Sequence, residues 1–123
     1  MMTQAVPLVL TDVLQLAEQS DRLDWQPFRP GVEIYPLYSD SGASVALLKY
    51  EPGASVPEHR HTGYEHIMVL SGSQRDRNGV YPVGTIVINP PESQHKVFSD
   101  DGCIIFIVWQ HPVQILDSDP DPC

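Results

Sequence analysis

The sequence predicts an all-β domain built from many short strands. Apolar and polar residues alternate repeatedly from about residue 32 onward, which indicates half-buried strands. Twelve prolines and eight glycines divide the 123 residues into short segments, as is typical of a fold with many turns. A chain of this length can enclose one hydrophobic core but not two. We therefore expect a single domain without an internal repeat.

Residues 1–30 are expected to form an arm that precedes this domain. Thr11 can cap a short helix from Asp12 to about Ser20. Its apolar residues on one face are Val13, Leu16 and Ala17. Three larger residues follow and are expected to anchor the arm on the sheet: Trp25, Pro27 and Phe28. The arm then covers the outside of the domain or exchanges with a second copy.

The main domain is expected to span residues 31–114 and to hold nine or ten strands. Residues 32–38 and 43–51 are the first two, and Pro36 indicates an edge position or a bulge. Ser71-Gly72-Ser73 is expected to end the strand that begins near residue 65. Asn78-Gly79 is the strongest hairpin turn in the chain, after a polar strand at 74–77.

The later strands are expected at 85–88, 96–98 and 103–109. The last of these is apolar on both faces, so we expect it to be covered on both sides. Residues 115–123 form an acidic, proline-containing tail that is expected to be disordered.

Three histidines and a glutamate predict a metal site. His59 and His61 are two residues apart and therefore point to the same face of a strand. Glu65 keeps the same parity, whereas His95 is thirty residues further on and needs a fold that brings two hairpins together. Imidazole and carboxylate suit a borderline divalent ion. We expect one transition metal ion per chain, with iron or zinc favoured over nickel or manganese.

Other polar residues have simpler explanations. His66 has the opposite parity to Glu65 and is expected to face away from the site, and His111 is expected on the surface. Arg75 and Arg77 alternate with Asp76 and indicate a solvated strand face. Several large residues could line a pocket or belong to the core, and parity does not distinguish these roles. They are Tyr50, Tyr64, Met68, Ile86, Phe98, Phe106 and Trp109.

Two segments around the expected ligands resemble the motifs of the cupin superfamily. Gly53-x5-His59-x-His61-x3-Glu65-x6-Gly72 matches the first motif at every fixed position, and Gly84-x5-Pro90-x4-His95 matches most of the second. Smaller matches lie at residues 69–72, 81–85 and 89–91. They make the chain similar to the C-terminal cupin domain of ChrR-type anti-sigma factors, a branch that also includes some dioxygenases. The resemblance covers roughly residues 25–112 and implies a double-stranded β-helix, or jelly-roll barrel.

The chain departs from the second motif at two positions. Glu92 stands where glycine is usual, so a positive φ there would carry a modest strain. Ser99 replaces a usual asparagine. Neither change removes an expected metal ligand.

Composition excludes several classes of partner and location. A net charge of −9 disfavours nucleic acids and anionic membrane surfaces. No segment is long and apolar enough to span a membrane, and the N-terminus lacks the basic region of a signal peptide. Cys103 and Cys123 are too few and too distant for a disulfide framework, so we expect free thiols in a reducing cytoplasm. Cys103 lies among apolar residues and is expected to be a buried, inert thiol rather than a redox sensor.

Three functions remain for the metal. An oxygenase would bind a small diketone or hydroxyaryl ketone, with His59, His61 and His95 holding iron. Glu65 would then be a fourth ligand or a base. A non-catalytic zinc sensor is the alternative that the ChrR-type resemblance implies. However, residues 1–30 lack the His and Cys ligands of an anti-sigma domain, so we do not expect direct sigma-factor inhibition by this chain alone.

The third function is structural, with a closed tetrahedral zinc that only stabilises the barrel. A wide apolar pocket beside the metal would favour catalysis or sensing, and a closed, buried site would favour this structural role. We also expect a homodimer, because exposed apolar strands need cover and proteins of the resembled family are commonly dimers.

Overall fold

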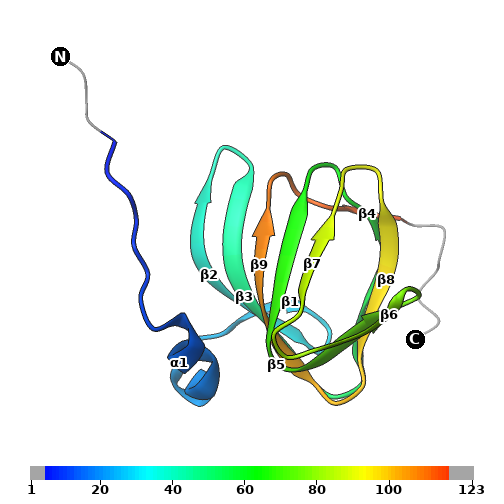
Figure 1. Ribbon diagram of the computed structural model, residues 1–123, viewed down its shortest axis with the longest axis horizontal. Helices are drawn as coiled ribbons and strands as arrows, with labels where there is room; N and C mark the ends of the chain where they lie inside the picture. The colour runs from blue at the N-terminus through cyan, green and yellow to red at the C-terminus, as the bar shows by residue number, and fades with distance from the viewer. Residues whose placement is uncertain (1–4, 117–123) are drawn as a thin grey trace.

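The computed structural model describes residues 5–116 and shows a curled barrel of antiparallel strands preceded by a short helix (Figure 1). The helical elements are α1 (Val13–Glu18) and the 3-10 turn η1 (Ser20–Arg22). The strands are β1 (Gln26–Arg29), β2 (Val32–Asp40), β3 (Ala43–Tyr50), β4 (Ala54–Arg60), β5 (Glu65–Asp76), β6 (Gly79–Pro82), β7 (Ile86–Asn89), β8 (Gln94–Ser99), β9 (Cys103–Trp109) and β10 (Gln114–Ile115). The expected all-β jelly roll with a short N-terminal helix is confirmed.

The strands run in the order β1-β2-β3-β9-β5-β8-β4-β10, and β6 and β7 both pair with β5. The core lies inside the curl, where Leu48, Ile67, Val69 and Ile105 are at most 3% exposed. Burial of these branched side chains on facing strands supplies the main stabilising free energy of the barrel.

β5 is longer than the sequence predicts, because the segment Ser71-Gly72-Ser73 does not end it. The strand continues to Asp76, and its pairing with β9 shifts register between Val69 and Ser71. Gly72 has φ +70 and lies where the backbone of Gly102 approaches closely. A bulge and a left-handed glycine bend a strand without interrupting it. The first half of β5 therefore pairs with β7 and β9, and the second half pairs with β6 and β8.

The N-terminal segment differs from the prediction in three details. Thr11 is not the helix cap: the capping position is Asp12, which has φ 59 and makes no side-chain capping bond. The sheet begins at Gln26 rather than at Val32, because β1 pairs with β2. Pro27 is exposed and anchors nothing.

Two aromatic residues do anchor this segment as expected. The ring of Trp25 meets Tyr35 edge to face, and Phe28 stacks on Trp109, each with 6.0 Å between ring centroids. Such pairs add to the apolar area that the contact buries.

Of three local expectations, the bulge at Pro36 is confirmed, the hairpin turn expected at Asn78-Gly79 lies one residue earlier, and the cover of β9 holds only in part. Pro36 marks a bulge in the β2–β3 pairing. A hairpin joins β5 to β6, with Asp76 opposite Gly79, so its two turn residues are Arg77 and Asn78. β9 is covered on both faces only near its start, where Ile104 and Ile105 are both buried. Most of the expected acidic tail, residues 117–123, lies outside the described residues. Among residues 5–116, no helix is long and apolar enough to cross a membrane.

Replacing Gly72 with alanine should destabilise the protein by roughly 2–5 kcal/mol, from left-handed strain and backbone overlap together. A Cβ at this position would lie 2.0 Å from the carbonyl oxygen of Gly102. Gly53→Ala is the matched control, because Gly53 has φ +84 but a Cβ added there would meet nothing within 4 Å. Chemical denaturation of both variants measures the difference in the free energy of unfolding. Equal losses would show that β5 does not depend on this close approach.

Candidate metal centre

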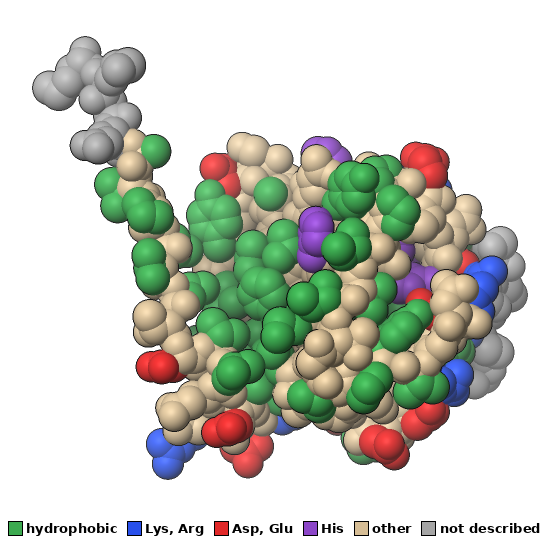
Figure 2. All heavy atoms as spheres, in the orientation of Figure 1, with side chains coloured by type: hydrophobic (Ala, Val, Ile, Leu, Met, Phe, Trp, Pro, Cys, Tyr) green, Lys and Arg blue, Asp and Glu red, His purple; other side chains and the backbone are tan. Residues whose placement is uncertain are grey.

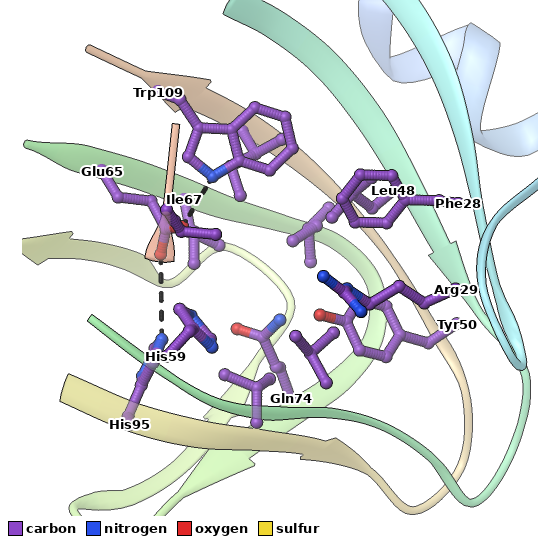
Figure 3. A pocket seen from close by; sticks show the side chains of 15 residues that line it. Phe28, Arg29, Leu48, Tyr50, His59, Glu65, Ile67, Gln74, His95 and Trp109 are labelled. Carbon is purple, nitrogen blue, oxygen red and sulfur yellow. Dashed lines mark hydrogen bonds and ion pairs between the residues drawn. The ribbon is translucent and has the colours of Figure 1, made fainter. Parts of the chain in front are cut away.

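The fold brings all four expected ligands to one place inside the barrel (Figure 3). His59 lies near the end of β4, directly opposite His95 on β8. His61 follows β4, and Glu65 begins β5. One ligand atom from each of the four lies within 4.8 Å of the others, and each residue is 1–4% exposed. Convergence of three imidazoles and one carboxylate is a suitable donor set for a divalent transition metal.

Hydrogen bonds fix the orientation of all three imidazoles. The Nδ1 atom of His59 donates to the carbonyl oxygen of Pro57 over 2.8 Å. His61 Nδ1 donates to both the carbonyl oxygen and the hydroxyl oxygen of Ser93, over 3.0 and 2.9 Å. The remaining ring, His95, donates from Nδ1 to Asp76 Oδ2 over 2.9 Å. In each neutral ring the Nε2 atom then carries the free lone pair, which is the arrangement that metal-binding histidines require.

Local sequence produces two of these acceptors. The β4–β8 register shifts between Val56 and His59. Pro57 lies within this bulge and cannot donate to the ladder, so its carbonyl can face His59. The turn after β7 presents Ser93, next to Glu92 with φ 76. Glu92, which replaces the usual glycine, therefore has a strained backbone conformation. Its carboxylate pairs with Arg60.

The Nε2 atoms fit a bound cation. His95 Nε2 is buried and has no hydrogen-bond partner among the described residues. His61 Nε2 lies 3.1 Å from Glu65 Oε1, so a neutral His61 would direct a lone pair at a carboxylate. A positive charge between these atoms removes the conflict. Burial lowers the pKa of His59 to about 4, which disfavours a protonated imidazole and favours a metal ion as that charge.

Glu65 is held by two donors outside the histidine cluster. Asn89 Nδ2 donates to Oε1 over 3.0 Å, and Trp109 Nε1 donates to Oε2 over 2.8 Å. Burial by itself would raise the pKa of Glu65. The contacts with the histidine cluster, chiefly with His61, outweigh it and hold the pKa below its usual value. The carboxylate is therefore ionised and fixed in position.

Sequence reasoning missed Asp76. Its Oδ2 receives the His95 proton, and its Oδ1 accepts from Tyr81 Oη at 2.7 Å and from the Asn78 backbone. Burial opposes ionisation, but these hydrogen bonds hold the pKa of Asp76 below its usual value. The signal was present, because Asp76, the last residue of β5, has the opposite parity to Arg75 and Arg77 along the sequence. Those two arginines do lie on the outer face, paired with Asp100 and Glu58.

The barrel interior contains a narrow cavity that reaches three of the four ligands, His59, Glu65 and His95. Its volume is about 30 Å³, which is room for one or two water molecules. Tyr50 and Trp109 line it, as the sequence suggested. The other pocket candidates do not line it. Met68, Ile86, Phe98 and Phe106 lie at strand positions that face outward, and Tyr64 lies in the loop before β5.

The remaining interpretations agree with the structure. His66 and His111 are exposed and lie outside the cluster. Cys103 is buried, and burial raises the pKa of its thiol to about 11, so it is an inert thiol at neutral pH. Ser99 is fully buried, and its hydroxyl donates to the Ser73 carbonyl oxygen over 2.6 Å.

Asp76→Asn should weaken metal binding by roughly 10- to 100-fold, as is usual when the partner of a ligating histidine is changed. The physical reason is that the asparagine amide lacks the negative charge of the Asp76 carboxylate, which keeps the proton of His95 on Nδ1. Titration of the metal-free protein with zinc and a competing chelator measures the affinity. Asp100→Asn is the control, because this exposed carboxylate pairs with Arg75 away from the site. Equal affinities for the two variants would contradict the role assigned to Asp76.

Comparison with known proteins agrees with the fold and with the sequence motifs. The family model of the ChrR cupin-like domain matches residues 15–113. The anti-sigma-E factor ChrR of Cereibacter sphaeroides is 30% identical over 93 residues, which are 73% of this chain and 43% of that protein. The chain thus spans less than half the length of this curated relative.

Two solved structures show the same fold. The complex of SigE with the anti-sigma ChrR from Rhodobacter sphaeroides matches with a TM-score of 0.69 at 24% identity, over 87% of this chain and 71% of that chain. An acetylacetone dioxygenase from Acinetobacter johnsonii matches with a TM-score of 0.74 at 16% identity, over 96% of this chain and 82% of that chain. Together with the family model, these similarities show that the chain belongs to the family of ChrR cupin-like domains.

Proposed function

We propose that this protein is a mononuclear metal-dependent dioxygenase that acts on a small diketone or hydroxyaryl ketone. The observation that carries the proposal is the contact between the interior cavity and the metal centre. His59, Glu65 and His95 line the cavity, and the rest of its wall is mainly apolar. A ligand in the cavity would therefore meet the metal directly. The fold shared with an acetylacetone dioxygenase supports the proposal.

Each residue of the site has a part in this chemistry. His59, His61 and His95 would hold the ion. A bound iron would supply open coordination positions and redox chemistry for a chelating substrate and dioxygen. Glu65 is fixed by Asn89 and Trp109, as a fourth ligand or as a base that takes a proton from the substrate carbon between two carbonyls. Apolar walls, including Ile67 and Ile107, exclude water from the site.

A non-catalytic zinc-binding regulatory domain is the second candidate. Membership of the ChrR cupin-like family and 30% identity with an anti-sigma-E factor support it. In this case the donor set binds zinc and the cavity binds a small effector or none. The protein partner would be recognised elsewhere on the surface.

The structural role gains support from the cavity size. All four ligands are buried, and about 30 Å³ does not hold a diketone without movement of the lining side chains. The lining residues that are at least partly exposed mark where the cavity meets solvent, and they are Phe28, Arg29, Trp109 and Val113. Their movement is the requirement that separates the dioxygenase from a purely structural metal site.

Iron-loaded protein should consume dioxygen when 2,4-pentanedione or a hydroxyaryl ketone is added. His61→Ala should lower the rate at least about 100-fold, since it removes a ligand rather than the partner of one. An oxygen electrode measures the rate, and the zinc-loaded protein is the redox-inactive control. Iron-loaded protein with no substrate-dependent uptake would overturn the dioxygenase and leave the regulatory and structural roles.

We also propose that the protein forms a homodimer through the outer face of β2, β3, β9, β5 and β7. Cross-strand pairing places side chains in two rows on this face. One row holds Ile86, Met68, Phe106, Leu47 and Tyr35, of which Leu47 is already fully buried within the chain. The other holds Ile88, His66, Val108, Val45 and Tyr38. Neither row contains an acidic or basic residue apart from His66, although the chain carries a net charge of −9.

This face is self-complementary, which favours a second copy as its partner. Ile86 and Ile88 on β7 are 61% and 57% exposed and form a ridge. At the other side, a groove lies between the extended N-terminal segment and the sheet. Its lining is Val6, Leu8, Leu10, Val13, Tyr38, Val45 and Phe106. Figure 2 shows hydrophobic side chains gathered on the sheet beside this segment. In a dimer with a two-fold axis between ridge and groove, the ridge of each copy would lie in the groove of the other, so the contact would form twice.

Light scattering during gel filtration should give a dimer for the wild-type protein and a monomer for the double variant Ile86→Glu, Ile88→Glu. The two glutamates would place charges inside the apolar interface. Val80→Glu is the control, because Val80 on β6 is 64% exposed and lies outside the two rows. A monomeric wild type, or a double variant that stays dimeric, would contradict this arrangement.

A further inference from the structure

Gln74 is a buried polar residue that the metal centre does not use. It lies on β5, is 2% exposed and lines the cavity. Its Nε2 atom has no hydrogen-bond partner within the described part of the chain. A buried amide without a partner costs free energy, so such a group in a cavity indicates a ligand that would accept its hydrogen bond.

Arg29 contributes a positive charge to the same cavity. It lies at the end of β1 and lines the cavity where it meets solvent. Arg60, Arg75 and Arg77 each pair with a carboxylate. Arg29 has no such pair among residues 5–116, and its guanidinium instead lies 6.0 Å from the centroid of the Phe28 ring. In a chain with 16 acidic and 7 basic side chains, this arginine is available for an anion from solution.

Tyr50 adds a third donor. Its ring is buried in the wall of the cavity that Arg29 also lines, and its hydroxyl points inward (Figure 3). The side-chain amide of Gln74 contacts this hydroxyl. Burial raises the pKa of Tyr50, so the hydroxyl keeps its proton and can donate it.

These donors lie apart from the metal ligands. In Figure 3, His59, Glu65 and His95 are on one side, Arg29 and Tyr50 are on the other, and Gln74 is between them. Apolar side chains such as Leu48, Ile67 and Ile107 form the wall that links the two groups. Glu65 is not the partner of Arg29, since no ion pair joins them and Trp109 and Asn89 already donate to its oxygens.

We propose that Arg29, Tyr50 and Gln74 form a carboxylate-binding subsite for a ligand whose other end reaches the metal centre. A guanidinium, a hydroxyl and an amide are donors that suit a carboxylate, and the charge-assisted bond from arginine is the strongest of them. The substrate class is therefore a diketone that carries a carboxylate at the end distant from the two carbonyls. Because the cavity measures about 30 Å³, this ligand requires the same movement of the lining side chains as the neutral diketone. This inference rests on the proposed metal centre for one end of the ligand, and on the three donors for the other.

The test compares two ligands that differ only in the carboxylate. 4,6-Dioxoheptanoate has a diketone at one end and a carboxylate at the other, and 2,4-heptanedione has a methyl group in place of that carboxylate. Calorimetry on zinc-loaded protein measures both affinities without turnover. The acid should bind at least about tenfold more tightly, as expected for a charge-assisted hydrogen bond.

Variants assign the preference to the subsite. Arg29→Gln should weaken binding of the acid by roughly 10- to 100-fold and change the affinity for the neutral diketone less than about twofold. Gln74→Met keeps the length of the side chain but removes the donor, and it should weaken binding of the acid by a smaller factor. Arg77→Gln is the matched control, because it removes the same charge from an exposed position that pairs with Glu58. It should alter neither affinity.

The outcomes separate this inference from the proposed catalysis. Equal affinity for acid and neutral ligand, equal weakening of both by Arg29→Gln, or no binding of the acid at millimolar concentration would overturn the subsite. Selective binding of the acid without oxygen uptake by the iron-loaded protein would support the subsite and overturn only the dioxygenase.

Discussion

A buried carboxylate among three imidazoles is the constraint on which the interior of this barrel depends. Glu65 is 3% exposed, and an ionised carboxylate in an apolar interior is costly unless positive charge or donors surround it. Asn89 and Trp109 supply two donors. The three imidazoles present lone pairs rather than protons once their Nδ1 hydrogens are engaged. A cation at their centre satisfies the carboxylate and the imidazoles at the same time, which explains why so many polar groups are buried together.

One strand provides most of the polar groups in the interior. β5 begins with Glu65, bends at Gly72 and ends with Asp76, whose carboxylate orients His95. Gln74 lies between them and presents an unpaired amide to the cavity. The bend is therefore part of the site. It allows β5 to pair with β7 and β9 in its first half and with β6 and β8 in its second half, and both halves contribute inward-facing residues. A change that straightened β5 would move Asp76 and Gln74 relative to Glu65.

The ligands could be predicted from sequence because their spacing and residue types are distinctive. His59, His61 and Glu65 share a parity, and the motif around them identifies the fold that brings His95 close. The residues that hydrogen-bond the ligands and orient them were harder to predict. Asp76 lies between two arginines and was assigned with them to a solvated face, although alternation along a strand places it on the opposite side. Pro57 acts through its backbone carbonyl, which any residue carries, and Ser93 acts through its carbonyl and its hydroxyl together.

The pocket was harder to predict than the ligands, for a topological reason. Met68, Ile86, Phe98 and Phe106 have the size of pocket residues but lie on outward-facing positions of their strands. Only the pairing of each strand with its neighbours determines which face is inside. Ser71-Gly72-Ser73 was interpreted as a break because glycine and serine usually end strands, whereas the close approach of Gly102 requires a glycine within this one.

The most direct test of the metal centre is an anomalous difference map from crystals of untagged protein, recorded at the absorption edge of the metal that X-ray fluorescence identifies. We expect one peak per chain, bonded to the Nε2 atoms of His59, His61 and His95 and in contact with Glu65. An iron signal would favour the dioxygenase, and a zinc signal would favour the regulatory or structural role. A peak at another position, or no peak in protein prepared without chelators, would contradict a barrel interior organised around a metal ion.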